Sequence, residues 1–153
     1  MLPKVTENYT RVGVDVGRIV HRILSHLSPD ILDGLNEVRL LENHNHAFAC
    51  YKKDEAAIEI YIAELLGDFR PIFLKLFYPF TYMLVGMAVG HELDHHLNRD
   101  DDEIDREASA EENIMKYVYP SLGIFKPTVR IVSFFCLPFR RSGEKQISDS
   151  KNG

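Results

Sequence analysis

The chain has 153 residues, of which 45% are hydrophobic and 27% are charged. This composition supports one globular domain with a substantial core, and a formal net charge of −5 argues against a general nucleic-acid-binding protein. Residues 126–153 hold six Lys or Arg and two acidic residues, a net charge of +4, so residues 1–125 carry −9. We therefore expect a single domain over residues 1–125 and a basic, partly disordered C-terminal extension over residues 126–153.

The N-terminal sequence and the cysteines indicate a cytoplasmic protein. Residues 1–8 are polar, and no early apolar run follows them as it would in a secretory signal peptide. Cys50 and Cys136 lie far apart in the sequence. Two such cysteines make neither a disulfide framework nor a cysteine-based metal site.

The first predicted element is an amphipathic helix over residues 10–27. Apolar residues recur there at intervals of three and four, which is the helical pattern. Pro29 ends this helix, because proline disfavours helical geometry at the residue before it. His21 and His26 are five residues apart, a poor spacing for one metal ion, and are expected to be surface residues.

The sequence that follows changes to the alternating pattern of β-strands. Three short strands are predicted over residues 37–41, 47–51 and 58–62, joined by polar turns of hairpin length. The simplest topology is a three-stranded antiparallel meander. His44 and His46 lie in the first connection, where exposed histidines are usually solvated, so we do not assign them to a metal.

Residues 71–90 are almost wholly apolar, with Lys75 as their only charge. Their length fits a membrane span, so membrane association is one interpretation of this segment. Pro71 and Pro79 interrupt it, and it runs directly into a pair of histidines, which favours a buried helix instead. We predict that this helix covers residues 79–97.

A further helix is predicted over residues 102–117. Acidic residues at its start suit the helix dipole, and Pro120 stops it. Residues 128–139 are apolar enough for one more strand or short helix. The expected fold is thus α+β, with an N-terminal helix, the antiparallel meander and two consecutive helices. The tail from Phe134 onward is also a candidate for self-inhibition, by occupying the cleft of the domain.

The most informative motif is His91-Glu92-Leu93-Asp94-His95, which has the form H-E-x-x-H. On a helix, residues four apart lie on one face about one turn apart, so His91 and His95 can bind a single zinc ion. Glu92 follows His91 directly, so on a helix it projects in a different direction from the two histidines. We predict that it acts as general base on a zinc-activated water in the hydrolysis of a peptide bond.

A catalytic zinc site has three protein ligands and one open position for water. The third ligand is expected in the acidic stretch downstream, most of which forms a solvated face. From the residues alone, the candidates are Glu103, Asp105, Glu107, Glu111 and Glu112. The donor that stabilises the developing oxyanion is equally open. The candidates within sequence reach are His96, Tyr117 and Tyr119.

Residues 80–118 resemble the gluzincin metallopeptidases, in which a glutamate on the helix after H-E-x-x-H completes the zinc site. The segment Glu107-Ala108-Ser109-Ala110-Glu111 is similar to their E-x-x-A-D arrangement, with Glu in place of the final Asp. The small size looks like the minimal gluzincins (minigluzincins) and the cores of regulatory peptidases that cleave repressors. The resemblance implies that Glu107 is the third zinc ligand and that Glu111 accepts an imidazole N–H from a ligand histidine.

The resemblance also implies a zincin-like minimal core, in which the edge strand of a sheet pairs with an extended peptide through main-chain hydrogen bonds. We therefore expect a cytoplasmic zinc metalloendopeptidase that acts on a peptide or protein and binds no nucleic acid. Two other interpretations stay open at this point. One is a zinc-binding regulatory or structural domain without activity, and the other is a membrane-associated protein in which H-E-x-x-H occurs by chance.

Overall fold

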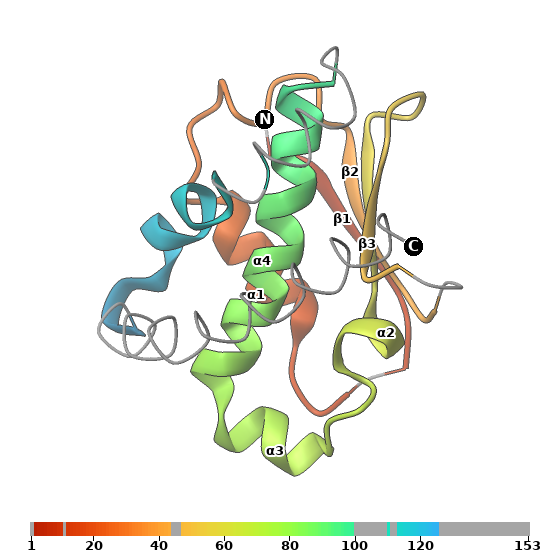
Figure 1. Cartoon of the computed structure of the whole chain (residues 1–153), viewed down its shortest axis with the longest axis vertical. Coiled ribbons are helices and arrows are strands. Elements are labelled where there is room, and N and C mark those ends of the chain that lie inside the picture. The colour runs from red at the N-terminus through yellow and green to blue at the C-terminus, as the bar shows by residue number, and fades with distance from the viewer. Residues whose placement is uncertain (1, 11, 44–46, 100–109, 111–112, 126–153) are drawn as a thin grey trace, which may run out of the picture.

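This computed structural model describes residues 2–10, 12–43, 47–99, 110 and 113–125. They form an α+β fold in which the longer helices pack on one face of a four-stranded mixed sheet (Figure 1). The strands are β1 (Lys4–Asn8), β2 (Glu37–Leu41), β3 (Ala49–Lys52) and β4 (Ala57–Tyr61). The helices include α1 (Val16–Leu24), α2 (Ile62–Leu66), α3 (Pro71–Leu76), α4 (Tyr78–Leu97) and the 3₁₀ helix η1 (Tyr119–Phe125).

The sheet has the strand order β1-β2-β4-β3. β1, β2 and β4 are parallel neighbours, and β3 lies at one end of the sheet, antiparallel to β4. The three strands predicted from the sequence are all present, but the predicted antiparallel meander is wrong. β2 pairs with β4 rather than with β3, and β1 is a strand that the sequence pattern did not indicate.

Burial accounts for this strand order. Val38 and Leu40 of β2, and Ile58 and Ile60 of β4, are fully buried, as expected for central strands covered by helices. All four residues of β3 are half-buried, as at a sheet edge. Apolar alternation identifies a strand but not its neighbours, so the sequence located these strands without determining how they pair.

α1 is shorter than the helix predicted over residues 10–27, because its N-terminus is fixed at Asp15. The Asp15 carboxylate accepts a hydrogen bond from the backbone N–H of Arg18 at 2.8 Å, which caps the helix. Gly13, just before it, has a φ of +89°, which lies in the left-handed region that favours glycine. The predicted apolar stripe is confirmed, and its buried members in α1 are Val16, Ile19, Val20, Ile23 and Leu24.

α4 confirms the helix predicted over residues 79–97. It lies beside α1 on the same face of the sheet, with α1 over β1 and α4 over β3 and β4 (Figure 1). The apolar segment is divided at Phe77, whose φ of −103° and ψ of 44° separate α3 from α4. Among the residues that the structure describes, no helix is both long enough and apolar enough to cross a membrane.

Two glycines bring α4 into close contact with the helical residues 113–118. A Cβ atom on Gly86 would lie 2.6 Å from Val118 Cγ1, and one on Gly90 would lie 2.9 Å from the carbonyl oxygen of Ile114. Both distances are too short for a real Cβ contact, so this approach requires residues without a side chain. The chain downstream of H-E-x-x-H is thereby packed along the same helix that carries the motif.

The helix predicted over residues 102–117 is seen in part. Residues 110 and 113–118 are helical, and the chain continues from Tyr119 as η1, which contains Pro120. The predicted start of this helix lies outside the described residues. The same holds for His44 and His46, and for the extension 126–153 with its predicted element and Cys136.

The contact at Gly90 makes a testable prediction about stability. Gly90→Ala places a methyl group against a backbone oxygen that cannot move by itself. We expect the free energy of unfolding to fall by about 1–3 kcal/mol, although alanine favours a helix over glycine by about 0.5–1 kcal/mol. The measurement is urea unfolding followed by circular dichroism.

Gly17→Ala is the matched control for this experiment. Gly17 is a buried helical glycine of α1, but a Cβ atom there meets only the end of the exposed, flexible Glu7 side chain. This substitution is expected to leave stability unchanged or slightly raised. Equal losses in the two variants would contradict the close packing of α4 against residues 113–118.

Candidate functional site

His91 and His95 lie on one face of α4 with their imidazoles turned toward each other. The two Nε2 atoms are 3.0 Å apart, the ring centroids are separated by 4.6 Å, and the ring planes make an angle of 84°. Both side chains are half-buried. The i, i+4 spacing of the motif therefore places the same ring atom of each histidine within 3.0 Å of the other.

This arrangement fits a zinc ion. Zinc–nitrogen bonds of about 2.0–2.1 Å in tetrahedral geometry hold two nitrogen atoms roughly 3.3 Å apart, close to the observed separation of 3.0 Å. A proton shared between the rings also fits this distance. The separation of the two Nε2 atoms is therefore compatible with their binding one cation.

A cavity of about 560 Å³ lies beside His91, and Glu92 faces it. Glu92 is only 6% exposed, so its carboxylate is held in a largely desolvated position. The remaining wall is mostly apolar and is formed by Phe48, Ala49, Leu65, Phe69, Leu84, Met87, Ala88 and Ile114, with the carboxylates of Glu64 and Asp68. The cavity thus combines an apolar surface with one buried carboxylate and one imidazole of the motif.

β3 forms one border of this cavity. Phe48, just before the strand, and Ala49, its first residue, line the wall of the cavity, and α4 packs against β3. β3 is the terminal strand of the sheet, so its outer edge has no strand partner among the described residues. Such an edge presents main-chain N–H and C=O groups to an extended peptide.

Asp94 connects α4 to the helical residues 113–118. Its carboxylate is 1% exposed and accepts hydrogen bonds from the Tyr117 hydroxyl at 2.6 Å and from Asn98 Nδ2 at 2.8 Å. Burial, together with the adjacent Asp94 carboxylate, raises the pKa of Tyr117. Tyr117, one of the three candidate oxyanion donors, is thus engaged in holding two helices together.

His96 is buried and serves as a structural contact. Its Nε2–H donates to the carbonyl oxygen of Asp33 at 2.9 Å, and its Nδ1 accepts from the Tyr51 hydroxyl at 2.9 Å. A carbonyl can only accept, so this pair of contacts fixes the tautomer. Burial lowers the pKa of His96, which agrees with a neutral ring. His96 therefore ties α4 to β3 and to the loop before β2.

The structure describes some of the other residues considered for the site and not the rest. His21 and His26 are exposed, as expected from their spacing. The proposed third ligand Glu107 and its neighbour Glu111 lie outside the described residues, as do Glu103, Asp105 and Glu112. Within the described ranges, no group of three His, Cys, Asp or Glu side chains is placed to hold a metal ion. The pair His91 and His95 is the part of the predicted ligand set that the structure describes.

Three contacts of the site were not found from the sequence: Asp94 with Asn98, Asp94 with Tyr117, and His96 with Tyr51. Asp94 and Asn98 are four residues apart on one helix, a spacing that signals a side-chain contact. Tyr117 and Tyr51 carry no such signal, because each reaches α4 from a distant part of the chain.

Comparisons of the chain with family models, with curated proteins and with solved structures found no match.

The role of His96 can be tested by stability measurements. His96→Ala leaves the Asp33 carbonyl and the Tyr51 hydroxyl without their partner in a buried place, so the free energy of unfolding should fall by at least about 2 kcal/mol. His26→Ala is the control, because His26 is exposed and its hydrogen-bond contacts within the described part of the chain are to the neighbouring residues Arg22 and Ser25. Its effect should stay within about 0.5 kcal/mol. Similar effects for both variants would show that His96 does not anchor α4.

Proposed function

We propose that the protein is a zinc-dependent metallopeptidase of the gluzincin type. The observation that carries the proposal is the convergence of His91 and His95 Nε2 at 3.0 Å on α4, beside a cavity faced by Glu92. A chance H-E-x-x-H has no reason to lie on a helix, to point both rings at one position, or to border a cavity. The motif here has all three properties.

The zinc ligands in this proposal are His91, His95 and Glu107, with Glu111 orienting a ligand imidazole. The first two are supported by their geometry, and the glutamates by the similarity of residues 107–111 to the second gluzincin motif. Zinc, when bound, makes a water molecule more acidic and polarises a carbonyl group. The close packing of residues 113–118 on α4 supports the assignment of Glu107, because that helical segment follows it in the chain.

Glu92 acts as the general base in this mechanism. Its carboxylate takes a proton from the attacking water and passes it to the leaving amine of the peptide bond. The position of Glu92 favours this role, since it follows a ligand histidine directly and is buried at the wall of the cavity. A largely water-free carboxylate at this place interacts strongly with the proton that it transfers.

The substrate in this proposal is a peptide segment in extended conformation. The outer edge of β3 offers main-chain hydrogen bonds, and the apolar wall of the cavity receives a side chain next to the bond that is cut. The carboxylates of Glu64 and Asp68 lie at the same cavity and favour a substrate without acidic residues there.

Metal analysis tests the ligand set. We expect one equivalent of zinc in the purified protein, and a loss of affinity above about 100-fold in His91→Ala, His95→Ala and Glu107→Ala, since removal of an outer partner of a ligand alone weakens binding roughly 10–100-fold. His26→Ala and Glu103→Ala are the matched controls and should keep the metal. Full zinc content in His95→Ala would rule out the proposed site.

Activity of Glu92→Gln tests the mechanism. This variant should retain zinc and lose about 10²–10⁴-fold in kcat on an unstructured protein substrate. Glu55→Gln, at an exposed carboxylate in the turn between β3 and β4, should be unchanged. Zinc binding without chelator-sensitive turnover by the wild-type protein would instead favour a zinc-binding domain that has no peptidase activity.

A further inference from the structure

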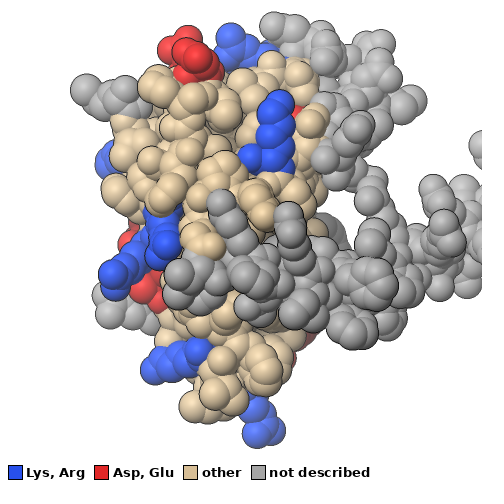
Figure 2. Space-filling model, turned by 90° about the vertical axis from the view of Figure 1, so that its left-hand side faces the viewer, with Lys and Arg blue, Asp and Glu red and all other residues tan. Residues whose placement is uncertain are grey.

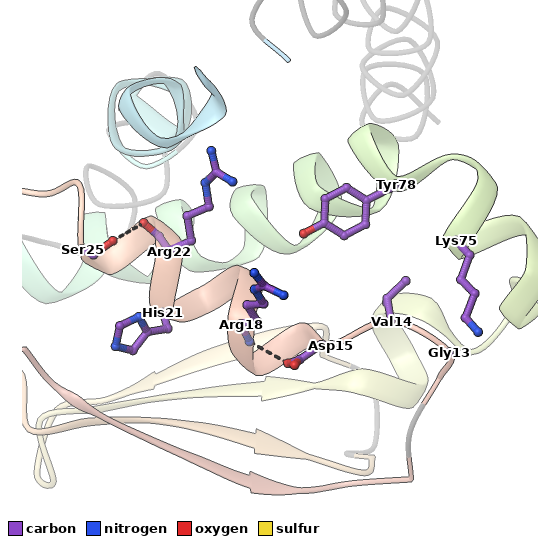
Figure 3. Close-up of a pocket in the computed structure, with 9 residues that line it drawn as sticks. All are labelled: Gly13, Val14, Asp15, Arg18, His21, Arg22, Ser25, Lys75 and Tyr78. Carbon is purple, nitrogen blue, oxygen red and sulfur yellow. Dashed lines mark hydrogen bonds between the residues drawn. The ribbon is translucent and has the colours of Figure 1, made fainter. Parts of the chain in front are cut away.

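A second hollow shares no lining residue with the cavity beside His91. It has a volume of about 650 Å³ and runs along α1, with the end of α3 and the start of α4 on its other side (Figure 3). Its side chains include Arg18, Arg22 and Lys75, together with the hydroxyl groups of Ser25 and Tyr78. In Figure 3, Arg18 and Arg22 extend from α1, and Lys75 lies at the other end beside Gly13.

The hollow is cationic. Arg18, Arg22 and Lys75 supply three positive charges, and Asp15 is the one carboxylate that lines it. The Asp15 carboxylate caps α1 through the Arg18 backbone N–H. Among the described residues, none of the three cations forms an ion pair with a carboxylate. On a chain with a net charge of −5, this is a local reversal of sign that suits an anionic group.

α3 adds an exposed apolar surface next to this hollow. Ile72 is 69% exposed, Leu76 is 74% exposed and Phe77 is 48% exposed. Ile72 and Leu76 are one helical turn apart and share a face, while Leu74 is fully buried and anchors the helix to the core. α3 lies at one end of the molecule (Figure 1), and these three large apolar side chains are exposed there.

The cationic hollow and the apolar surface meet at α3. Lys75 belongs to α3 and lines the hollow, and Pro71 at the start of α3 approaches Gly13 so closely that a Cβ there would lie 2.8 Å from Pro71 Cβ. Arg70, at the N-cap of α3, is exposed as well. Figure 2 shows Lys and Arg side chains at the left edge and the lower end of that view, with Asp or Glu side chains beside those at the left edge.

We propose that this face docks on a membrane surface that contains anionic phospholipids. Arg18, Arg22 and Lys75 bind headgroup phosphates, and Ile72, Leu76 and Phe77 enter the boundary between headgroups and acyl chains. Interfacial binding of this kind combines buried apolar area with attraction between basic residues and anionic lipid. An exposed apolar surface edged by basic residues has both parts.

This interaction differs from a membrane span. α3 has six residues and lies at the surface, so its side chains reach only the interfacial layer. The proposal is also independent of zinc binding and of peptidase activity, because neither His91 nor Glu92 takes part.

Co-sedimentation with vesicles tests the proposal on the full chain. The vesicles are made of phosphatidylcholine, with or without phosphatidylserine, in about 0.1 M and about 1 M salt, where the Debye length falls from about 10 Å to about 3 Å. We expect binding to the phosphatidylserine vesicles in low salt and loss of binding in high salt. Residues 126–153 carry a net charge of +4, so the variants decide where the contact lies.

Three variants locate the contact. Ile72→Ser/Leu76→Ser should lower the partition coefficient at least about tenfold, and Arg18→Gln and Lys75→Gln should each lower it about fivefold. Leu97→Ser and Lys116→Gln are the matched controls, since Leu97 is 40% exposed and Lys116 is exposed, and both lie outside this face. Circular dichroism checks that each variant is folded.

The outcomes are distinct. Binding that is weakened by the α3, Arg18 and Lys75 variants but not by the controls supports the docking face. Absence of binding to anionic vesicles, or equal binding by all variants, overturns it. A dimer seen by light scattering and disrupted by Ile72→Ser/Leu76→Ser would also overturn it, because the face would then be an interface between two copies of the chain.

Discussion

The rotation of α4 about its own axis is the constraint on which the candidate site depends. Successive residues of an α-helix project about 100° apart, so His95 points between the directions of Asp94 and His96. Asp94 is bonded to Tyr117 on one side, and His96 is bonded to β3 and to the loop before β2 on the other. These buried polar contacts hold the helix in one orientation, and that orientation decides which part of the fold His91 and His95 face.

The order of the strands decides what lies beside the motif. In a β2-β3-β4 meander, β3 would be the central strand and both of its edges would be paired. In the observed order, β4 takes the position next to β2, and β3 becomes the terminal strand beside α4. Ala49 of the terminal strand β3 therefore borders the same cavity as His91 and Glu92, an arrangement that suits the proposed peptide substrate.

The apolar run over residues 71–90 is divided between two environments, one buried and one exposed. In α4, Tyr82, Val85 and Val89 are fully buried, so apolar residues on several sides of the helix are explained by packing against α1, the sheet and residues 113–118. In α3, the exposed apolar residues have no such explanation in the described fold. The break at Phe77 separates a core helix from a surface helix that the sequence presents as one segment.

By itself the sequence determined the features that depend on neighbours within about one helical turn or one strand. These are the extents of β2 and α4, the buried stripe of α1 and the one-sided placement of His91 and His95, all of which follow from periods of 3.6 and 2 residues. The tertiary structure alone decided the strand order, the added strand β1 and the roles of His96 and Tyr117. These depend on partners such as Tyr51, 45 residues from His96, and Asp94, 23 residues from Tyr117. Local periodicity carries no information about such partners, because chain folding rather than residue spacing brings them together.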